Sequence, residues 1–387
     1  MVQGVLGRVG SGCWNIVFKV LPPFVFPPIV LRPIVFLPVV FLPIVLLSGS
    51  PARAANKAEA KAVPAPPDLL LEGGRKLTFE RAFATEKEVL GKPKFWTRVL
   101  NVVAGEPEYR MMIRPYSIAV DSHGRAIVTD PAAEGVHIFD FEKHKYKFIE
   151  RRDKEKDAMT SPQCVALDAQ DNIYVTDSEA GKIFVFEPSG KYRRTIGNLK
   201  GGEGYFKRPT GIAVDSAAQR IYVTDTLRNK IYVLDMQGSV LQTVGKGGTG
   251  KGEFYYPTEL HLDGENLLVV DAMNFRVQWF KRNGDVEGTL GQVGDSLGQM
   301  FRPKGVAVDS EDHLYIVDAL SGLVQVFNRQ GQLLYYFGKR GVNLGEFQLP
   351  EGMFIDRNDR VFVVDSFNHR VQVFDYHGLK QGRGAGQ

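Results

Sequence analysis

The chain repeats one pattern six times, and this repetition constrains its fold more than any other feature. Each copy is anchored by a proline, and consecutive prolines lie 46 to 48 residues apart. A bulky apolar residue stands three positions before each proline, and an aspartate stands six positions after it. A fixed period of about 20 to 50 residues indicates an architecture in which each repeat buries the face of its neighbour. The six prolines are Pro115, Pro162, Pro209, Pro257, Pro303 and Pro350.

Each repeat contains four short segments rich in β-branched and aromatic residues, which is the composition of strands. Residues 212–214 are apolar throughout, as expected for an innermost strand that packs between two blades. Residues 222–225 and 324–327 are typical of the second and third strands, and glycines bracket a fourth at 331–338. Four strands in about 47 residues make one propeller blade. The sequence therefore predicts an all-β, six-bladed β-propeller of four-stranded antiparallel blades.

A second aspartate follows the first by eight to ten residues in every repeat, at the end of the second predicted strand. A ring of six carboxylates superficially resembles a calcium site. Aspartate before a turn, however, commonly accepts hydrogen bonds from turn amides. We interpret these aspartates as turn caps, and we expect neither a metal ion nor a cofactor. They are Asp130, Asp177, Asp225, Asp271, Asp318 and Asp365.

The last repeat lacks a fourth strand, because the residues after Gly378 are too rich in glycine to form one. Residues 98–105, upstream of the first repeat, have the fourth-strand pattern. We expect them to pair with the last blade, so that an N-terminal strand closes the ring and removes its exposed edges. The propeller would then span residues 95–380, preceded by an Ala/Pro-rich tether and lead-in segment at 55–94 and followed by a flexible tail at 381–387. Residues 77–83 alternate in polarity and are a further candidate strand lying on the propeller.

Residues 1–54 are typical of an export signal, with a weakly basic start, an apolar stretch and a small-x-small cleavage pattern at Ala52 and Ala54. The mature chain would begin near Ala55 and lie in the periplasm, the cell envelope or outside the cell. A proline at every fifth position makes the apolar stretch a poor helix, but a retained membrane anchor stays open as the alternative.

Charge and cysteine content limit the possible partners. The signal segment contains four basic and no acidic residues, so the remaining chain has 44 basic and 44 acidic residues. Such a neutral chain argues against electrostatic binding of nucleic acid.

Cys164 is the single cysteine beyond the signal, so no internal disulfide can form. We expect it to be a small buried residue, and we expect the protein to be a monomer.

The repeats resemble NHL repeats from about residue 114 to residue 378. This resemblance implies a six-bladed propeller that is used mostly for binding or scaffolding, with a minority of enzymes among its relatives. The lead-in block also resembles that of exported bacterial six-bladed NHL proteins. The elements that carry these resemblances are Pro-x-Gly-Ile-Ala-Val-Asp, Ile-Tyr-Val-Thr-Asp and Asn368-His369-Arg370-Val-Gln-Val-Phe in the repeats, and Pro66-Pro67-Asp68, Arg81-Ala-Phe83 and Phe95-Trp96 in the lead-in.

One face of the propeller collects the loops before the prolines and the loops after the second aspartates. These loops mix guanidinium, amide and aromatic side chains, which suits a polar or anionic ligand such as a peptide carboxylate or an acidic glycan. We therefore predict a non-enzymatic binding or scaffold module for a protein, peptide or glycan partner. Arg276 and Arg370 recur at equivalent positions, so we interpret them as internal struts that pair with repeat aspartates. The predicted ligand-binding rim consists of Arg208, Arg228, Asn229, Lys230, Asn274, Lys304, Glu351, Asn368 and His369.

The alternative is an enzyme centred on the channel, a lyase or a lactonase-like hydrolase. Glu259 and His261 are weak catalytic candidates, because residues two apart on an inner strand share a face. Propeller lyases that this fold resembles use channel histidines with partners, but His261 is the only histidine on a predicted inner strand. Two or more ionisable side chains that converge on the channel at hydrogen-bond distance would favour the enzyme, and a merely basic rim would favour the binding module.

Overall fold

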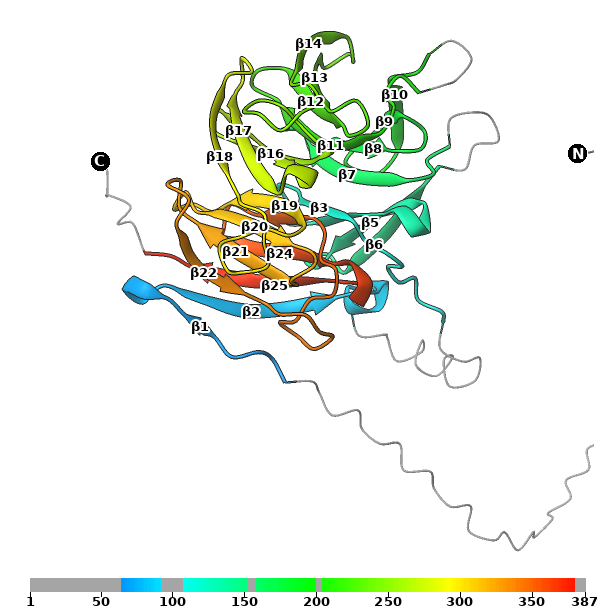
Figure 1. Cartoon of the computed structure of the whole chain (residues 1–387). Coiled ribbons are helices and arrows are strands. Elements are labelled where there is room, and N and C mark those ends of the chain that lie inside the picture. Colours follow the sequence, from blue (N-terminus) through cyan, green and yellow to red (C-terminus); the bar gives the residue numbers. More distant parts are fainter. Residues whose placement is uncertain (1–63, 92–106, 152–157, 200–203, 380–387) are drawn as a thin grey trace, which may run out of the picture. The chain divides into compact units, whose positions relative to one another are not determined.

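The computed structural model describes residues 64–91, 107–151, 158–199 and 204–379. These residues form six antiparallel sheets, and each repeat in the sequence provides one of them (Figure 1). In the first five blades the four strands follow one another in sequence, from the innermost to the outermost. The predicted all-β six-bladed propeller is confirmed.

The first five blades contain twenty of the strands. Blade 1 consists of β3 (Ser117–Val120), β4 (Ala126–Asp130), β5 (Gly135–Asp140) and β6 (Lys145–Glu150). Blade 2 consists of β7 (Pro162–Leu167), β8 (Ile173–Asp177), β9 (Lys182–Phe186) and β10 (Tyr192–Ile196). Blade 3 consists of β11 (Pro209–Asp215), β12 (Arg220–Asp225), β13 (Lys230–Asp235) and β14 (Val240–Val244). Blade 4 consists of β15 (Pro257–Asp263), β16 (Asn266–Asp271), β17 (Arg276–Lys281) and β18 (Val286–Leu290), and blade 5 of β19 (Pro303–Val308), β20 (Leu314–Asp318), β21 (Leu323–Phe327) and β22 (Leu333–Phe337).

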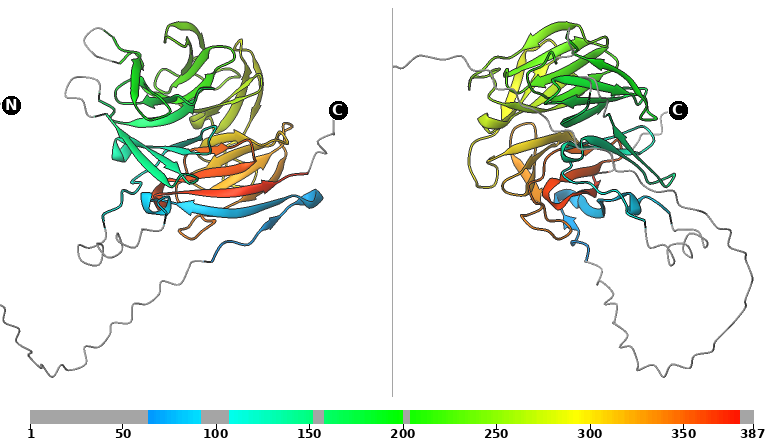
Figure 2. Two further views of the ribbon diagram at one scale, coloured as in Figure 1. Left: turned by 180° about the vertical axis from the view of Figure 1, so that it is seen from behind. Right: turned by 90° about the vertical axis from the view of Figure 1, so that its right-hand side faces the viewer.

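Blade 6 joins the two ends of the propeller. It combines β23 (Met353–Ile355), β24 (Arg360–Asp365) and β25 (Arg370–His377) with β2 (Lys76–Phe83), on which the short strand β1 (Leu69–Leu70) pairs. Strand β2 runs antiparallel to β25, from Lys76 opposite His377 to Phe83 opposite Val371. Figures 1 and 2 show the two strands side by side from the front and from behind. An N-terminal strand therefore closes the ring.

The closing strand is not the one that the sequence suggested. Residues 98–105 lie outside the described residues, and β2 occupies the outer place on β25 that we assigned to them. Residues 77–83 alternate in polarity, and β2 is anchored on both of its faces. Leu77 packs into the apolar cluster between blades 5 and 6, and Phe83 packs into the cluster between blades 6 and 1. Packing across two blade interfaces therefore stabilises β2 at this place on β25. The alternation of polar and apolar residues along a strand does not reveal such packing.

The hydrophobic core is divided among the blade interfaces. The inner strands contact one another in the cyclic order β3, β7, β11, β15, β19, β23 and back to β3. One cluster of buried residues fills each interface between neighbouring blades. The apolar residue three positions before each proline is buried in these clusters. The inner strands are thus apolar on both faces because each packs against two neighbouring blades.

The second aspartates cap backbone amides, as the sequence predicted, and in all six repeats the capped amides include one in the loop that leads into the proline, which the sequence did not indicate. The carboxylate of Asp130 accepts hydrogen bonds from the amides of Ile113 (2.6 Å) and Arg114 (3.0 Å). Asp225 accepts the amides of Lys207 (2.8 Å) and Arg208 (3.1 Å) in the same way. The other four aspartates each accept the amide two positions before their own proline. Each carboxylate therefore fixes the loop that leads into the inner strand of its own blade.

Five short 3-10 helices complete the described secondary structure. They are η1 (Glu72–Gly74), η2 (Glu86–Glu88), η3 (Pro131–Ala133), η4 (Ala272–Asn274) and η5 (Ser366–Asn368). In the described ranges, no helix has the length and apolar character needed to cross a membrane.

Candidate functional site

Two cavities open at opposite ends of the inner strands, and the residues after the prolines line one of them. This cavity, which we call the basic mouth, has a volume of about 840 Å³. Every position directly after a proline contributes to its lining, and these six positions hold six side chains of varied size and charge. They are Tyr116, Gln163, Thr210, Thr258, Lys304 and Glu351.

The basic mouth is rich in positive charge and in aromatic surface. Among the described residues that line it, Arg114, Arg208, Arg302 and Lys304 stand against the single carboxylate of Glu351. The guanidinium groups of Arg208 and Arg302 are exposed and make no hydrogen bond or ion pair with any described residue. Tyr116, Tyr256, Phe275 and Phe301 supply the aromatic part of the lining.

Lys304 and Glu351 form an ion pair at the bottom of the basic mouth. The Lys304 Nζ lies 2.6 Å from the Glu351 Oε2, and both side chains are almost buried. The same ammonium lies 5.6 Å from the centre of the Tyr116 ring. Burial, reinforced by the nearby Glu351 charge, raises the pKa of Tyr116, so this phenol stays protonated at neutral pH. The pair neutralises Lys304, which leaves the guanidiniums as the uncompensated charges of the mouth.

Glu259 lies on β15, next to Thr258 of the basic mouth, and lines the second cavity, at the other end of the inner strands. Other repeats place Ser117, Cys164 or a glycine at this position. The Cys164 Sγ donates to the Glu259 Oε2 across 3.3 Å. Burial raises the pKa of Glu259 to about 7, with the Glu351 charge raising it further and the bond from Cys164 and the Lys304 charge lowering it. Glu259 is therefore poised to gain or lose a proton near neutral pH.

Cys164 is buried, as the sequence predicted. Burial, together with the neighbouring Glu259 carboxylate, raises the pKa of its thiol. A thiol with a raised pKa is a poor nucleophile, because the thiolate is the reactive form. Cys164 therefore acts as a hydrogen-bond donor that holds Glu259 in the channel.

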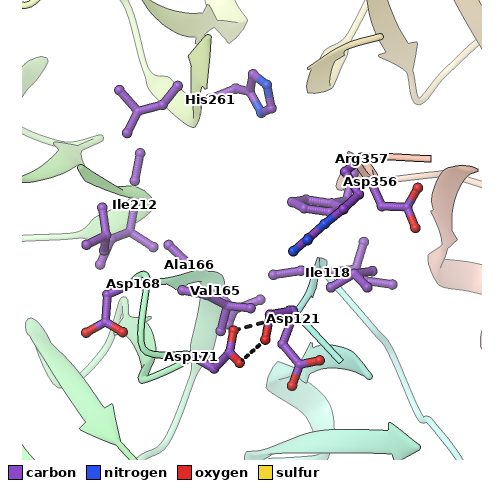
Figure 3. A pocket seen from close by; sticks show the side chains of 18 of the residues that line it. Ile118, Asp121, Val165, Ala166, Asp168, Asp171, Ile212, His261, Asp356 and Arg357 are labelled. Atoms are coloured by element: carbon purple, nitrogen blue, oxygen red, sulfur yellow. Dashed lines mark hydrogen bonds between the residues drawn. The ribbon is translucent and has the colours of Figure 1, made fainter. Parts of the chain in front are cut away.

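The second cavity, which we call the acidic mouth, lies at the other end of the inner strands and has a volume of about 670 Å³. Figure 3 shows Asp121, Asp168, Asp171 and Asp356 around it. These carboxylates are already engaged with the protein. Asp168, for example, accepts the side-chain amide of Asn172 at 2.8 Å, and the other three accept hydrogen bonds from Ser122 or from arginines in their own turns.

His261 lines the acidic mouth and points toward its open space (Figure 3). Burial lowers its pKa to about 4, while the Asp263 charge opposes this shift. The imidazole is therefore neutral at physiological pH. Within the described residues no hydrogen bond links His261 to Glu259, which pairs with Cys164 instead. The structure brings both predicted residues to the channel but does not join them as an acid–base pair.

The predicted rim residues separate into two groups. Arg208, Lys304 and Glu351 line the basic mouth. The other six, which do not line it, serve the loops around it in the following ways. Arg228 bonds to Asp225 and to the carbonyl of Tyr205, and Asn229 accepts the amide of Tyr256. Lys230 begins β13, where it pairs with Asp225. Asn274 donates to Asp271 and to a loop carbonyl, and Asn368 does the same with Asp365. His369 contacts the carbonyl of Ile113.

Arg276 and Arg370 are internal struts, as the sequence predicted. The Nε of Arg276 lies 2.9 Å from the Oδ2 of Asp271, and the Nε of Arg370 lies 2.7 Å from the Oδ2 of Asp365. Both side chains are largely buried.

Our set of rim residues omitted Tyr116, Arg302 and the aromatic wall formed by Tyr256, Phe275 and Phe301. The signal that could have revealed the mouth is the position after each proline, which holds five different residue types in the six repeats. Residues that serve the fold recur, so variation at a position with one fixed place in the ring indicates a ligand site.

No group of three or more His, Cys, Asp or Glu side chains arranged to hold a metal ion occurs in the described part of the chain.

Comparisons with known proteins agree with this architecture. Residues 213–284 and 305–383 match a family described as 6-bladed beta-propeller (DUF5128), and residues 159–186 match the NHL repeat. No match was found among the curated proteins.

Several solved structures share the fold at low sequence identity. A gluconolactonase from Xanthomonas campestris superposes with a TM-score of 0.52 at 16% identity, over 81% of this chain and 99% of that one. An auxiliary nutrient binding protein from Bacteroides thetaiotaomicron gives 0.53 at 12% identity, over 69% and 70%. A streptogramin B lyase gives 0.51 at 13% identity, over 69% and 94%. At such identities the likeness establishes the fold alone, and together with the six repeated sheets it identifies the chain as a six-bladed β-propeller.

Proposed function

We propose that the chain is a binding protein whose basic mouth holds an anionic group of a peptide, protein or glycan partner. The observation that carries this proposal is the pair of exposed guanidiniums of Arg208 and Arg302, which have no ionic partner among the described residues. They face a cavity in which Lys304 is already neutralised by Glu351 at 2.6 Å. Uncompensated positive charge at a concave site favours an anionic ligand.

The chemistry of the lining favours a carboxylate carried on a partly apolar ligand. A guanidinium presents a planar fork of donors that matches a carboxylate with two parallel hydrogen bonds. The aromatic wall of Tyr256, Phe275 and Phe301 can pack against a sugar ring or an apolar side chain next to that carboxylate. Both a uronic acid and a peptide with a terminal or side-chain carboxylate meet these requirements.

Calorimetric titration of the full chain with trigalacturonate and with the peptide acetyl-Gly-Glu-Glu-Gly-amide tests this proposal. We expect at least one probe to bind and its affinity to fall as salt is added, because exposed charges are screened. The variant R208A/R302A should weaken binding by about tenfold or more. The control K207A/R357A removes the same charge from exposed residues that do not line the basic mouth, and it should bind like the wild type. Equal loss in both variants, or no binding of either probe, would contradict the proposal.

An enzyme centred on the channel is the second candidate, because ionisable side chains do converge there at bonding distance. Glu259 contacts Cys164, Lys304 contacts Glu351, and the pKa of Glu259 is raised to about 7. A carboxyl group that titrates near neutral pH suits general acid–base catalysis in a lyase or a hydrolase.

Hydrolysis of simple γ- and δ-lactones by the full chain, measured as a function of pH, tests this second candidate. Catalysis by ionised Glu259 predicts a rate that rises with pH through an apparent pKa near 7. The variant E259Q should abolish this activity. The control H261Q alters the other channel residue and should retain it. A rate that E259Q leaves unchanged would exclude Glu259 as the catalytic residue.

We also propose that the protein is exported and processed near Ala55, on the basis of the small-x-small pattern at Ala52 and Ala54. N-terminal sequencing of the protein from its native host checks this directly. A mature chain that retains residues 1–47 would show that the segment is an anchor instead.

A further inference from the structure

Blades 4, 5 and 6 share one local arrangement, which we call the frame. It consists of the second aspartate, a glutamine on the third strand and the carbonyls of the loop before the inner strand. In each of them a glutamine on the third strand holds the loop that precedes the inner strand. Each glutamine accepts a hydrogen bond from a loop amide and donates one to a loop carbonyl. The two distances are 3.0 and 2.9 Å for Gln278, 2.7 and 2.7 Å for Gln325, and 2.8 and 2.7 Å for Gln372. The three loops therefore present their carbonyls in the same arrangement.

In blades 4 and 6 an arginine at the start of the third strand fills this frame. Arg276 donates to the Asp271 carboxylate and to the carbonyls of Thr249 (2.9 Å), Gly250 (2.7 Å) and Glu253 (2.9 Å). Arg370 similarly donates to the Asp365 carboxylate and to two carbonyls of its own loop, at 2.6 and 3.0 Å. Twice in this chain, then, one carboxylate and a set of loop carbonyls bind a guanidinium.

Blade 5 keeps the frame but lacks the arginine. Leu323 stands at its position, and Ser321 stands where the other two blades have an asparagine. A cavity of about 360 Å³ occupies the place, lined by Asp295, Ser296, Gln299, Asp318, Leu323 and Gln325.

Asp318 remains almost fully buried at the wall of this cavity, with an exposed fraction of 2%. It accepts only backbone amides, including that of Phe301 at 2.6 Å, and it has no ion pair with a described residue. Arg340 also lines the cavity, but its guanidinium is exposed and donates to the carbonyl of Leu320 at 2.6 Å. A buried carboxylate without a cationic partner favours uptake of a cation.

We propose that the blade 5 cavity binds the side chain of an arginine from a partner peptide or protein. The guanidinium takes the place that Arg276 and Arg370 fill in the neighbouring blades, bonded to Asp318 and to the loop carbonyls. The aliphatic stem packs on Leu323. A planar guanidinium with five donors fits several acceptors at once, whereas a lysine ammonium is a compact charge with three. This site adjoins the basic mouth, with which it shares Phe301 and Leu320, but selects the opposite charge.

Calorimetric titration of the full chain with acetyl-arginine-amide, which carries a guanidinium and no carboxylate, tests the proposal. We expect one equivalent to bind, and we expect acetyl-citrulline-amide, which has nearly the same shape without the charge, to bind at least tenfold more weakly. The variant L323R places the chain's own guanidinium in the cavity, so it should abolish binding and raise the melting temperature. The control L323M adds no charge to the cavity and should retain binding within about twofold.

Equal binding of the citrulline probe, or undiminished binding to L323R, would overturn the proposal, as would failure of the arginine probe to bind at millimolar concentration. If L323R does not melt cooperatively, R276L provides the decision. It opens the equivalent frame in blade 4, so the stoichiometry should rise from one to two. A stoichiometry that stays at one in a folded R276L protein would show that the frame itself does not bind guanidinium.

Discussion

The two mouths of the channel are built by the same six inner strands, yet they carry opposite charge for different reasons. Three of the first aspartates, Asp121, Asp168 and Asp356, line the acidic mouth; a first aspartate recurs in every repeat, and these three accept amides of their own turns. The basic mouth is formed by positions that differ from repeat to repeat. The comparison teaches that a ring of like residues in a repeat protein can be a product of the fold, whereas the dissimilar ring is where a ligand is expected.

Ionic pairing supports the same distinction. At the acidic mouth Asp121 and Asp356 each pair with an arginine four residues on. At the basic mouth the guanidiniums of Arg208 and Arg302 have no such partner among the described residues. Charges that serve a turn are thus neutralised inside the repeat, and charges that face the basic mouth are left for a ligand.

Removal of the closing strand should damage both mouths alike and is the largest effect that we expect. Deletion of residues 1–83 removes β2, and with it the buried side chains of Leu77 and Phe83. The loss of burial and of the outer strand should cost several kcal/mol and lower the melting temperature by about 10 °C or more. Deletion of residues 1–54 is the control and should leave melting unchanged. Similar melting curves for the two truncations would show that β2 is not needed to close the ring.

Reversal of charge at the basic mouth should separate the two mouths sharply. The double variant R208E/R302E opposes an anionic ligand with two carboxylates, and unfavourable like-charge contacts cost several kcal/mol, or about a hundredfold or more in affinity. We expect binding of an acidic probe to be lost while the melting temperature stays within a few degrees of the wild type. The variant R357E, at the acidic mouth, should bind as before. A comparable loss in R357E would place the ligand at the acidic mouth instead.

Glu259 and His261 should give opposite pH dependences of stability. The folded protein raises the pKa of Glu259 from 4.5 to about 7, so its contribution is complete below pH 4.5 and is lost as pH rises through 7. The folded protein lowers the pKa of His261 from 6.5 to about 4, so its contribution is present above pH 6.5 and is lost as pH falls through 4. Each effect is worth about 3 kcal/mol in the free energy of unfolding.

Denaturant unfolding of single variants between pH 4 and pH 8 reveals each contribution. The variant E259Q should leave a stability that rises up to about pH 6.5, and H261Q should leave one that falls up to about pH 7 and then levels off. If both variants keep the wild-type pH profile, neither residue titrates as the channel environment implies.

Loss of a turn cap should have the smallest effect, and here the mouths differ in binding more than in stability. Asp225 holds the amides of Lys207 and Arg208, so D225A should lower the free energy of unfolding by about 2 kcal/mol and also weaken binding at the basic mouth. D356A removes the cap of a turn at the acidic mouth, and it should cost similar stability but leave binding unchanged. Denaturant unfolding and calorimetry on both variants check this. Equal binding by D225A and wild type would show that the cap does not position Arg208.

The repeat, the number of blades and the capping role of the second aspartates were predictable from the sequence, because these features recur with a fixed spacing. It also identified Arg276 and Arg370 as struts and Cys164 as a buried residue. Periodicity carries such information because each blade repeats the same local contacts.

Features that depend on contacts across the ring became visible only in the three-dimensional structure. Strand β2 rather than residues 98–105 closes blade 6, because Leu77 and Phe83 pack into two different interfaces. Glu259 forms its hydrogen bond with Cys164, which lies 95 positions away in the sequence, and not with His261 on its own strand. Spacing along one strand reports which side chains share a face, but closure of the ring brings distant repeats to one axis. The partners of a channel residue are therefore set by the geometry of the whole propeller and cannot be read from any single repeat.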